Sequence, residues 1–386
     1  MLIYYVIFLI LSLSAFMTGK KRNLAILGFT IYSILYVFEA RVGMDYEAYQ
    51  SFYNSMNGIG DLSAGGYEIG YNLLALLFHK IGLPFQFFHI CFFATIDFLF
   101  FKATRKLNLE LGITALLALY YVFYPSLEAM RQWIATSLFL YSLTFILPNS
   151  HEANTDDMKF FILNFIGFLF HRTAILAFIF YFFRKNKSLR IGIVCALIFF
   201  AALQPFILNY LQRFPLFYNR YYYYVWSRSI ETESTSSISI KLLEYTFSFA
   251  VLLFICFKDN YRIAISEGRI KIIGKKKKQN QSIIQYIYYQ FIDSGNRLSL
   301  VENISLHLVG LGLIIQVFIT PILGSVYRLV YYCDLGIIMF YAAIYHRIRN
   351  AGMKCLYILF LIFYVGFRLW RVFPFDNEHF IYHFLF

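Results

Sequence analysis

The chain has 386 residues, of which 60% are hydrophobic and 14% are charged, and its formal net charge is +13. Apolar runs long enough to cross about 30 Å of hydrocarbon recur along it, which excludes a pair of soluble domains. The basic residues cluster between these runs, most densely in "GKKKKQ" at 274–279, so no nucleic acid partner is expected. The composition predicts an all-α, polytopic integral membrane protein in which residues 1–386 form a single transmembrane domain.

Ten apolar segments are predicted to cross the membrane, and the basic residues between them set the orientation. The cluster "KKR" at 20–22 places the first turn on the cytoplasmic side. The predicted spans are 2–17, 24–38, 84–101, 109–124, 128–147, 190–210, 241–257, 298–319, 326–345 and 353–372. This order leaves external loops near 39–66 and 211–240, and a basic cytoplasmic loop near 258–297.

Two further segments do not fit as ordinary spans. Residues 66–80, "GYEIGYNLLALLFHK", offer about 15 residues, or roughly 22 Å of helix, and predict an external interfacial or re-entrant helix. Residues 159–187 have basic residues at both ends and His171 and Arg172 in the middle. We expect a hairpin of two short helices there, because a single crossing would leave the second basic end outside.

Charged residues gather on the external side of this topology, where arginine is normally scarce. The stretch "YVFEARVGMDYEAYQSFY" at 36–53 contains both Arg41 and Asp45. Arg131, in "YPSLEAMRQWIATSLFLYS", and Arg328, in "GSVYRLVYYCD", each lie at the outer start of a span. The planar guanidinium binds phosphate through two parallel hydrogen bonds, so the set indicates an anionic ligand. The alternative for each arginine is snorkelling to lipid headgroups.

Aromatic residues are also abundant, with 33 tyrosines and 46 phenylalanines. The external stretch "NRYYYYVWSR" at 219–228 is especially rich in tyrosine. Aromatic rings can stack on sugar rings while tyrosine hydroxyls bond to the sugar rim, although an interfacial aromatic belt is the alternative for any single tyrosine.

Four stretches follow one another along the chain: "RVGMDYEAY", "GYEIGYNLLALL", "MRQWIATSLFLYS" and "FHRTAIL". In this order and membrane context they resemble the EpsG-like branch of the Wzy-type polysaccharide polymerases. The similarity covers most of the chain, whereas region 205–297 does not align. The resemblance implies a GT-C-like membrane glycosyltransferase of the bacterial cytoplasmic membrane, with its active site facing outside.

The resemblance further implies which molecules react. The donor is a growing glycan on undecaprenyl diphosphate and the acceptor is a lipid-linked repeat unit, with a chain-length regulator as a possible protein partner. Cations must take up the charge of the leaving diphosphate, and a base must accept the proton of the attacking hydroxyl. Arginines could suffice for the first task, and the five cysteines lack metal spacing, so no metal and no cofactor are expected.

Candidate residues follow from these two requirements. Asp45 is the first candidate for the base and His171 the second. The predicted diphosphate ligands are Arg131, Arg328, Arg41 and Arg172, and the predicted sugar ligands are Tyr49, Glu68, Gln132, Arg220 and Tyr332. The alternatives are a helix-capping pair of Asp45 with Arg41, and a structural role for His171.

Three other functions remain open at this point. A flippase of lipid-linked oligosaccharide would share the substrate, but it is expected to show internal pseudo-symmetry, which is not visible. An O-antigen ligase would use similar chemistry on another acceptor. A membrane O-acyltransferase would use a buried histidine such as His171.

Overall fold

The structure is a computed structural model of the full chain. It describes residues 2–17, 22–40, 43, 45–63, 66–146, 156–185, 235–266, 300–316, 328–372 and 383–384. The chain divides into two compact units: unit 1 is Met1–Phe178 with Tyr341–Phe386, and unit 2 is Ile179–Phe340. The predicted span 190–210 lies outside the described residues.

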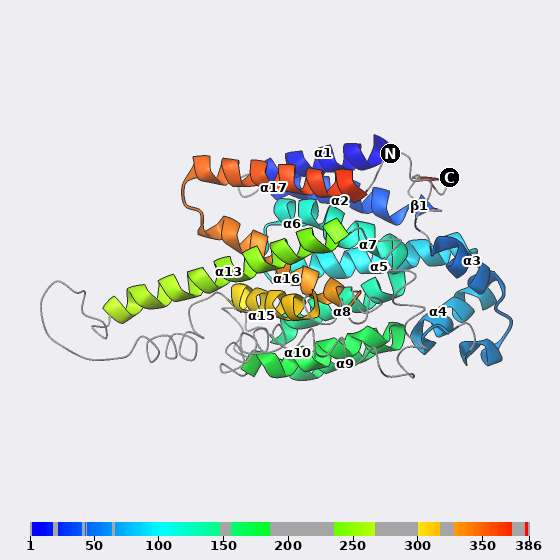
Figure 1. The fold of residues 1–386 in the computed structure, drawn as a ribbon. Coiled ribbons are helices and arrows are strands. Elements are labelled where there is room, and N and C mark those ends of the chain that lie inside the picture. Colours follow the sequence, from blue (N-terminus) through cyan, green and yellow to red (C-terminus); the bar gives the residue numbers. More distant parts are fainter. Residues whose placement is uncertain are drawn as a thin grey trace, which may run out of the picture. The chain divides into compact units, whose positions relative to one another are not determined.

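Helices make up nearly all of the described chain (Figure 1). Those of unit 1 are α1 (Leu2–Phe16), α2 (Arg22–Val37), α3 (Tyr46–Asn54), η1 (Ile59–Ser63), α4 (Ile69–Lys80), α5 (Phe85–Lys106), α6 (Leu111–Ala118), η2 (Leu119–Phe123), α7 (Tyr124–Glu128), α8 (Met130–Ile146), α9 (Asp157–Phe170), η3 (Arg172–Ala174) and α17 (Ala351–Val372). Two-residue strands, β1 (Glu39–Ala40) and β2 (His383–Phe384), pair in antiparallel fashion. Unit 2 contains α13 (Thr235–Ser266) and α15 (Leu300–Ile314), while α10 (Ile175–Lys185) and α16 (Val330–Arg347) continue across the unit boundary.

Each predicted span within the described residues coincides with a helix or with consecutive helices. Among these residues, three helices are long and apolar enough to cross a bilayer: Phe85–Lys106, Leu111–Glu128 and Ala351–Trp370. Three shorter helices are also apolar: Tyr4–Phe16, Ala25–Val37 and Val301–Ile314. The all-helical architecture is confirmed, with three helices able to cross a bilayer by length and composition. The number of ten crossings, the GT-C-like class and a single transmembrane domain stay predictions.

The loops differ in part from the expectation. α13 is longer than its predicted span, so residues 235–240 and 258–266 belong to a helix and not to the loops on either side. The external loop near 39–66 contains α3 and η1. Long helices commonly continue past the apolar segment, because hydropathy defines the depth of the membrane and not the end of the helix.

The predicted short helix at 66–80 is α4, which is 12 residues or about 18 Å long, too short for about 30 Å of hydrocarbon. Its end is set by Gly82, whose φ of 81° is the left-handed conformation that glycine adopts most readily. The N–H groups of Gly82 and Leu83 donate to the carbonyls of His79 and Phe78, which is a Schellman cap. Pro84 then precedes α5.

The predicted break at His171 is confirmed, since α9 ends at Phe170 and α10 begins at Ile175. The rings of Phe161 and Phe178 stack with centroids 6.1 Å apart, so the chain folds back on itself after α9. On its other side α9 packs closely on α8, because Gly167 has no side chain to hold it away from Ala135.

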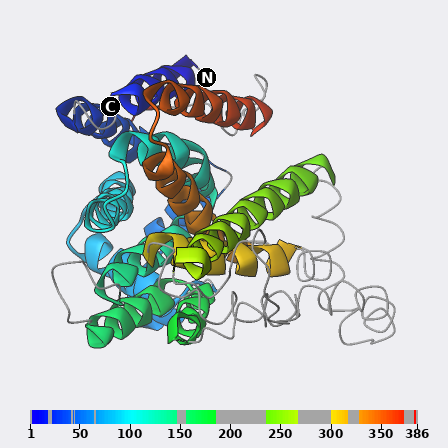
Figure 2. The same ribbon diagram turned by 90° about the vertical axis from the view of Figure 1, so that its left-hand side faces the viewer.

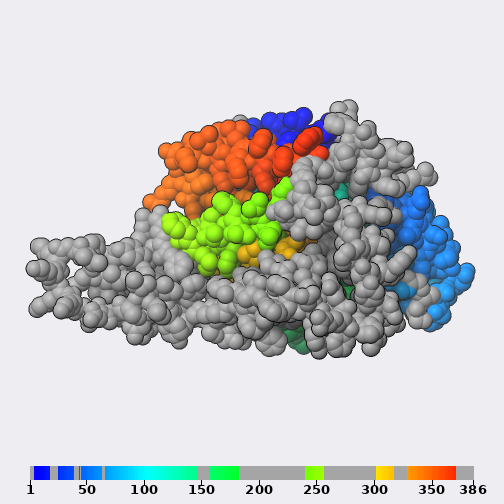
Figure 3. Space-filling model, in the orientation of Figure 1, coloured from blue at the N-terminus to red at the C-terminus, as the bar shows by residue number. Residues whose placement is uncertain are grey.

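α17 lies beside α1 and against α6 and η2 (Figure 1). Arg368 is buried there, with its guanidinium over the ring of Tyr120 at 4.4 Å and a hydrogen bond to the Tyr120 hydroxyl. The hydroxyls of Tyr121 and Tyr364 lie 2.8 Å apart. The opposite side of α17 is exposed and apolar, and Figure 3 shows it at the surface in orange and red. This is the pattern of a helix that faces lipid on one side.

In unit 2, α13 packs beside α15 (Figure 2). Gly312 permits this contact, because a Cβ there would collide with the ring of Tyr245. The Tyr245 hydroxyl donates to Asp334 Oδ1 on α16 at 2.6 Å, and Ser305 Oγ donates to the carbonyl of Gly336 at 2.7 Å. Side-chain hydrogen bonds therefore join the three helices inside this unit.

Candidate functional site

Arg131 lies in the first turn of α8, just after a corner of the chain. The preceding helical run widens to a π-helix at Leu119–Phe123, close to Pro125, which has no N–H to donate. The run ends at Ala129, whose φ and ψ of −132° and 48° are not helical, and α8 starts at the next residue. The Arg131 side chain is only 16% exposed, so its neighbours rather than water must stabilise its positive charge.

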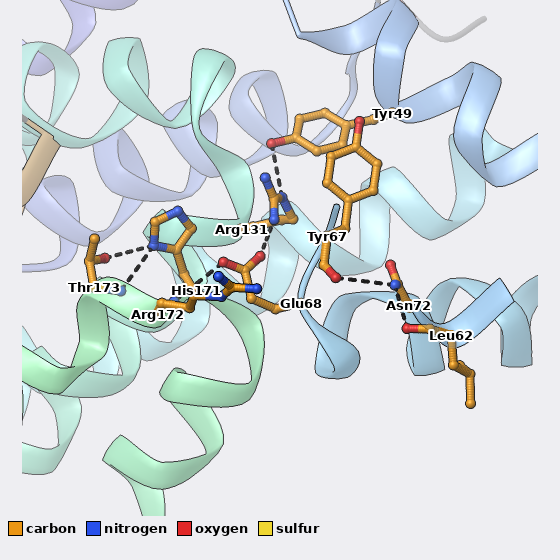
Figure 4. A network of polar contacts seen from close by, with 9 residues as sticks. All are labelled: Tyr49, Leu62, Tyr67, Glu68, Asn72, Arg131, His171, Arg172 and Thr173. Carbon is orange, nitrogen blue, oxygen red and sulfur yellow. Dashed lines mark hydrogen bonds and ion pairs between the residues drawn. The ribbon is translucent and has the colours of Figure 1, made fainter. Parts of the chain in front are cut away.

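Three tyrosines, Tyr49, Tyr67 and Tyr71, surround the Arg131 guanidinium and are called here the tyrosine cage. The guanidinium carbon lies 5.7, 4.4 and 5.8 Å from their respective ring centroids. Arg131 Nε also donates to the Tyr49 hydroxyl at 3.3 Å (Figure 4). Each ring contributes about 0.5–2 kcal/mol of cation–π attraction at such distances, so the cage holds the guanidinium in place.

Glu68 bridges two segments from the position just before α4. Its Oε2 forms an ion pair with Arg131 Nη1, and its Oε1 accepts a hydrogen bond from the Arg172 backbone N–H at 3.3 Å (Figure 4). Its side chain makes no capping bond to α4. The carboxylate is 12% exposed. A predicted sugar ligand is therefore, in this structure, the counterion of Arg131.

Two glycines bring the surrounding segments into contact. Gly43 has a φ of 90°, and a Cβ there would collide with the carbonyl oxygen of Leu127. A Cβ on Gly70 would lie 2.7 Å from the carbonyl oxygen of Leu169. The first contact joins the "RVGMDY" stretch to the corner before Arg131, and the second joins "GYEIGY" to the end of α9. All four stretches that were singled out in the sequence thus meet in unit 1.

Asp45 is the residue before α3 and lies close to the same tyrosines. The α3 helix confirms that Tyr49 is one turn away, with its backbone N–H donating to the Asp45 carbonyl at 3.0 Å. Burial raises the pKa of Tyr49 and of Tyr67, while the charge of Arg131 lowers both pKa values and the charge of Asp45 raises both. Arg131 and Asp45 therefore both lie within electrostatic range of Tyr49 and Tyr67. Asp45 makes no side-chain capping bond to α3. Its alternative pairing with Arg41 lies outside the described residues and stays a prediction.

His171 lies at the break between α9 and η3, directly before Arg172. Its Nδ1 accepts the Thr173 backbone N–H at 3.3 Å and lies 2.7 Å from Thr173 Oγ1 (Figure 4). A neutral imidazole whose Nδ1 accepts a hydrogen bond carries its proton on Nε2, which is then a donor. The Arg172 side chain is exposed and makes no ion pair with the residues that the structure describes.

The other predicted residues lie elsewhere in the sequence or outside the described residues. Gln132 follows Arg131 on α8 and is 1% exposed. Arg328 and Tyr332 belong to unit 2, where Tyr332 is buried at the start of α16. Arg41 and Arg220 lie outside the described residues. Their predicted roles stay predictions.

The sequence analysis missed the tyrosine cage as a unit. Tyr67 and Tyr71 flank the start of α4 four residues apart, and this i, i+4 spacing next to Glu68 was the available signal. It also missed Asn72, whose Nδ2 donates to the carbonyls of Leu62 at 2.8 Å and Tyr67 at 3.3 Å and so holds the segment before α4 (Figure 4).

Metal ligation is not evident in this part of the chain. Among the described residues, no three His, Cys, Asp or Glu side chains are grouped so that they could hold a metal ion. Within the described part of this cluster, the guanidinium groups of Arg131 and Arg172 and the backbone N–H of Arg172 could each contact an anion.

The comparisons with known proteins give one match. The sequence model of the EpsG family matches residues 22–386, which is nearly the whole chain. No curated protein and no solved structure matches. The matched range includes all of the residues around Arg131 described above. The chain therefore belongs to the EpsG family, a family of Wzy-like polymerases.

Proposed function

We propose that this protein joins lipid-linked oligosaccharide repeat units into a polysaccharide by glycosyl transfer in the membrane. The donor is a glycan carried on undecaprenyl diphosphate, and the acceptor is a second lipid-linked unit. The enzyme would be a GT-C-like glycosyltransferase of the bacterial cytoplasmic membrane, with the Arg131 site on the external side. Membership of the EpsG family supports the reaction class.

One observation carries the assignment of the site. The tyrosine cage holds Arg131, and the charges of Arg131 and Asp45 both influence the pKa values of Tyr49 and Tyr67. A fixed guanidinium suits a developing negative charge, because it is already oriented when the charge appears. A carboxylate nearby suits proton removal from a hydroxyl. The cluster supports the proposal because it offers one group for each requirement of the reaction.

The proposed reaction has one chemical step. The acceptor hydroxyl oxygen attacks the anomeric carbon of the donor glycan, and the bond from that carbon to the diphosphate oxygen breaks. The electron pair leaves with undecaprenyl diphosphate, whose charge is stabilised by Arg131 and the exposed Arg172. The hydroxyl proton passes to the Asp45 carboxylate, which is regenerated when the proton is lost to water.

His171 is better suited to donating a hydrogen bond than to accepting a proton in this arrangement. Because its Nδ1 already accepts from Thr173, the neutral ring would offer an Nε2–H to a phosphate or sugar oxygen. We therefore keep Asp45 as the proposed base and assign His171 to binding. Tyr49 would offer its hydroxyl to sugar, and the other cage tyrosines would offer their ring faces.

Deletion of the gene in its native background tests the function. We expect a surface glycan shortened to single repeat units, because units would still be made and exported without being joined. Complete loss of the surface glycan would instead indicate a flippase or a ligase. Retention of full-length glycan without its acyl groups would indicate an O-acyltransferase.

A further inference from the structure

Glu68 occupies a position that suits an anion of the substrate. Its two carboxylate oxygens each receive a donor from another element: Nη1 of Arg131 on α8, and the backbone N–H of Arg172 after α9. A guanidinium beside a backbone N–H is a donor pair that proteins use for phosphate oxygens as well as for carboxylates. Figure 4 shows the carboxylate lying between these two donors.

Arg131 does not depend on Glu68 alone for its position. The tyrosine cage covers the guanidinium, and Tyr49 accepts from Nε, so Nη1 keeps its place if the carboxylate moves away. Glu68 itself has φ and ψ of −73° and 151°, an ordinary extended conformation, and its side chain makes no capping bond to α4. Its carboxylate can therefore leave by side-chain rotation without unwinding a helix.

The charges nearby favour such an exchange. The Arg172 side chain is exposed and makes no ion pair with any residue in the described part of the chain. An anion that replaces Glu68 could therefore contact Nη1 of Arg131, the Arg172 N–H and the Arg172 guanidinium together. A diphosphate carries more negative charge than the single charge of a phosphodiester headgroup, so it gains more from this second cation.

We propose that the Glu68 carboxylate is an exchangeable internal anion, which holds the phosphate position of the site and is displaced by the diphosphate of the lipid-linked substrate. This inference rests on the proposed function. Glu68 is then a specificity-determining residue. A diphosphate displaces the carboxylate, whereas the singly charged headgroups of bulk phospholipids do not, and the returning carboxylate helps to release the diphosphate product.

The test measures binding to the purified full-length protein in detergent, with farnesyl diphosphate and phosphatidylglycerol as probes. Glu68→Gln removes the charge and keeps the shape. We expect it to bind farnesyl diphosphate about 10- to 100-fold more tightly, the range set by one charge-assisted hydrogen bond, and to gain affinity for phosphatidylglycerol. Glu47→Gln, which removes an exposed charge on α3, is the matched control and should change neither affinity.

Unchanged or weaker diphosphate binding by Glu68→Gln would overturn the exchange and make Glu68 a positioning partner of Arg131. Glu68→Ser serves the same comparison if the glutamine variant does not fold. With a lipid-linked repeat unit as substrate, Glu68→Gln should lower KM and also lower kcat, because product release slows. A rise in KM would contradict the inference.

Arg131→Ala separates this inference from the proposed function. If Arg131→Ala abolishes farnesyl diphosphate binding while Glu68→Gln fails to tighten it, only the exchange is wrong. If Arg131→Ala binds the diphosphate as wild type does, the proposed diphosphate site is itself wrong.

Discussion

Gly70 on α4 touches the backbone of Leu169 on α9, where a Cβ would lie 2.7 Å from the carbonyl oxygen and 2.8 Å from the carbonyl carbon. The contact is between backbones, so a side chain at position 70 cannot be accommodated by rotamer changes. It is also close in the chain to the hydrogen bond from the Arg172 backbone N–H to Glu68, since Glu68 directly precedes α4 and Arg172 follows α9.

Gly70→Ala should therefore separate α4 from α9 and remove the hydrogen bond from Arg172 N–H to Glu68. We expect a loss of polymerising activity and a drop of about 1–3 kcal/mol in the free energy of unfolding, as is usual for overpacking. Ladder formation from lipid-linked units and thermal unfolding in detergent measure the two effects. Gly58→Ala, at a glycine with nothing within 4 Å of the added carbon, is the control and should be neutral.

Arg131→Ala should abolish polymerisation and also destabilise the protein, because it leaves the Glu68 carboxylate largely buried without its cation. A fully buried pair loses about 3–5 kcal/mol when one partner is removed, and the partial exposure here reduces this to roughly 1–3 kcal/mol. The double variant Arg131→Ala/Glu68→Ala should recover most of the stability but none of the activity. Recovery of both would show that Arg131 has only a structural role.

Arg131→Lys provides a second comparison at the same position. We expect only partial activity, because an ammonium keeps the charge but lacks the planar fork and the stacking on Tyr67.

Arg328→Ala should abolish polymerisation, as Arg131→Ala does, if Arg328 is the second diphosphate ligand. Normal glycan ladders from both alanine variants would place the diphosphate elsewhere.

Tyr67 contributes its ring to the cage, and the described contacts of its side chain are ring contacts. Tyr67→Phe should therefore keep near-normal activity, whereas Tyr67→Leu should lose about tenfold or more, since leucine has no π face for the guanidinium. Tyr49→Phe should be more harmful than Tyr67→Phe, because the Tyr49 hydroxyl accepts from Arg131 Nε. Equal activity of the two phenylalanine variants would contradict this division of roles.

Asp45→Asn should be as inactive as Asp45→Ala if Asp45 is the base. The amide keeps the shape of the side chain but cannot take a proton, and a positioned base contributes about 10²–10⁴-fold to the rate. His171→Gln should weaken substrate binding more than it slows turnover, because His171 is assigned to donating a hydrogen bond to the substrate. A working Asp45→Asn together with an inactive His171→Gln in the ladder assay would make His171 the base.

The orientation can be tested with cysteines introduced into a cysteine-free background. Tyr46 follows Asp45 in the predicted external loop, but its side chain is only 3% exposed, so the neighbouring Glu47, which is exposed, is the better position. Glu47→Cys should react with an impermeant thiol reagent applied from outside. Arg349→Cys, at an exposed position in the predicted cytoplasmic turn before α17, should not. The reverse pattern would invert the topology.

The sequence by itself determined the membrane class, the approximate helices and the family. Apolar length and the position of basic residues are local properties, and they located the break at His171 and the short helix at 66–80 because each depends on a few neighbouring residues. It also marked Arg131, Asp45 and Glu68, since charged residues next to membrane spans are costly and therefore conspicuous.

Only the tertiary structure decided how these residues are paired. Glu68 and Arg131 are 63 positions apart, and the sequence pattern assigned the first to sugar and the second to phosphate. Their ion pair depends on the corner at Ala129 and on the close approaches at Gly43 and Gly70, which are contacts between distant backbones. No local propensity encodes such contacts, because they exist only when the helices have packed.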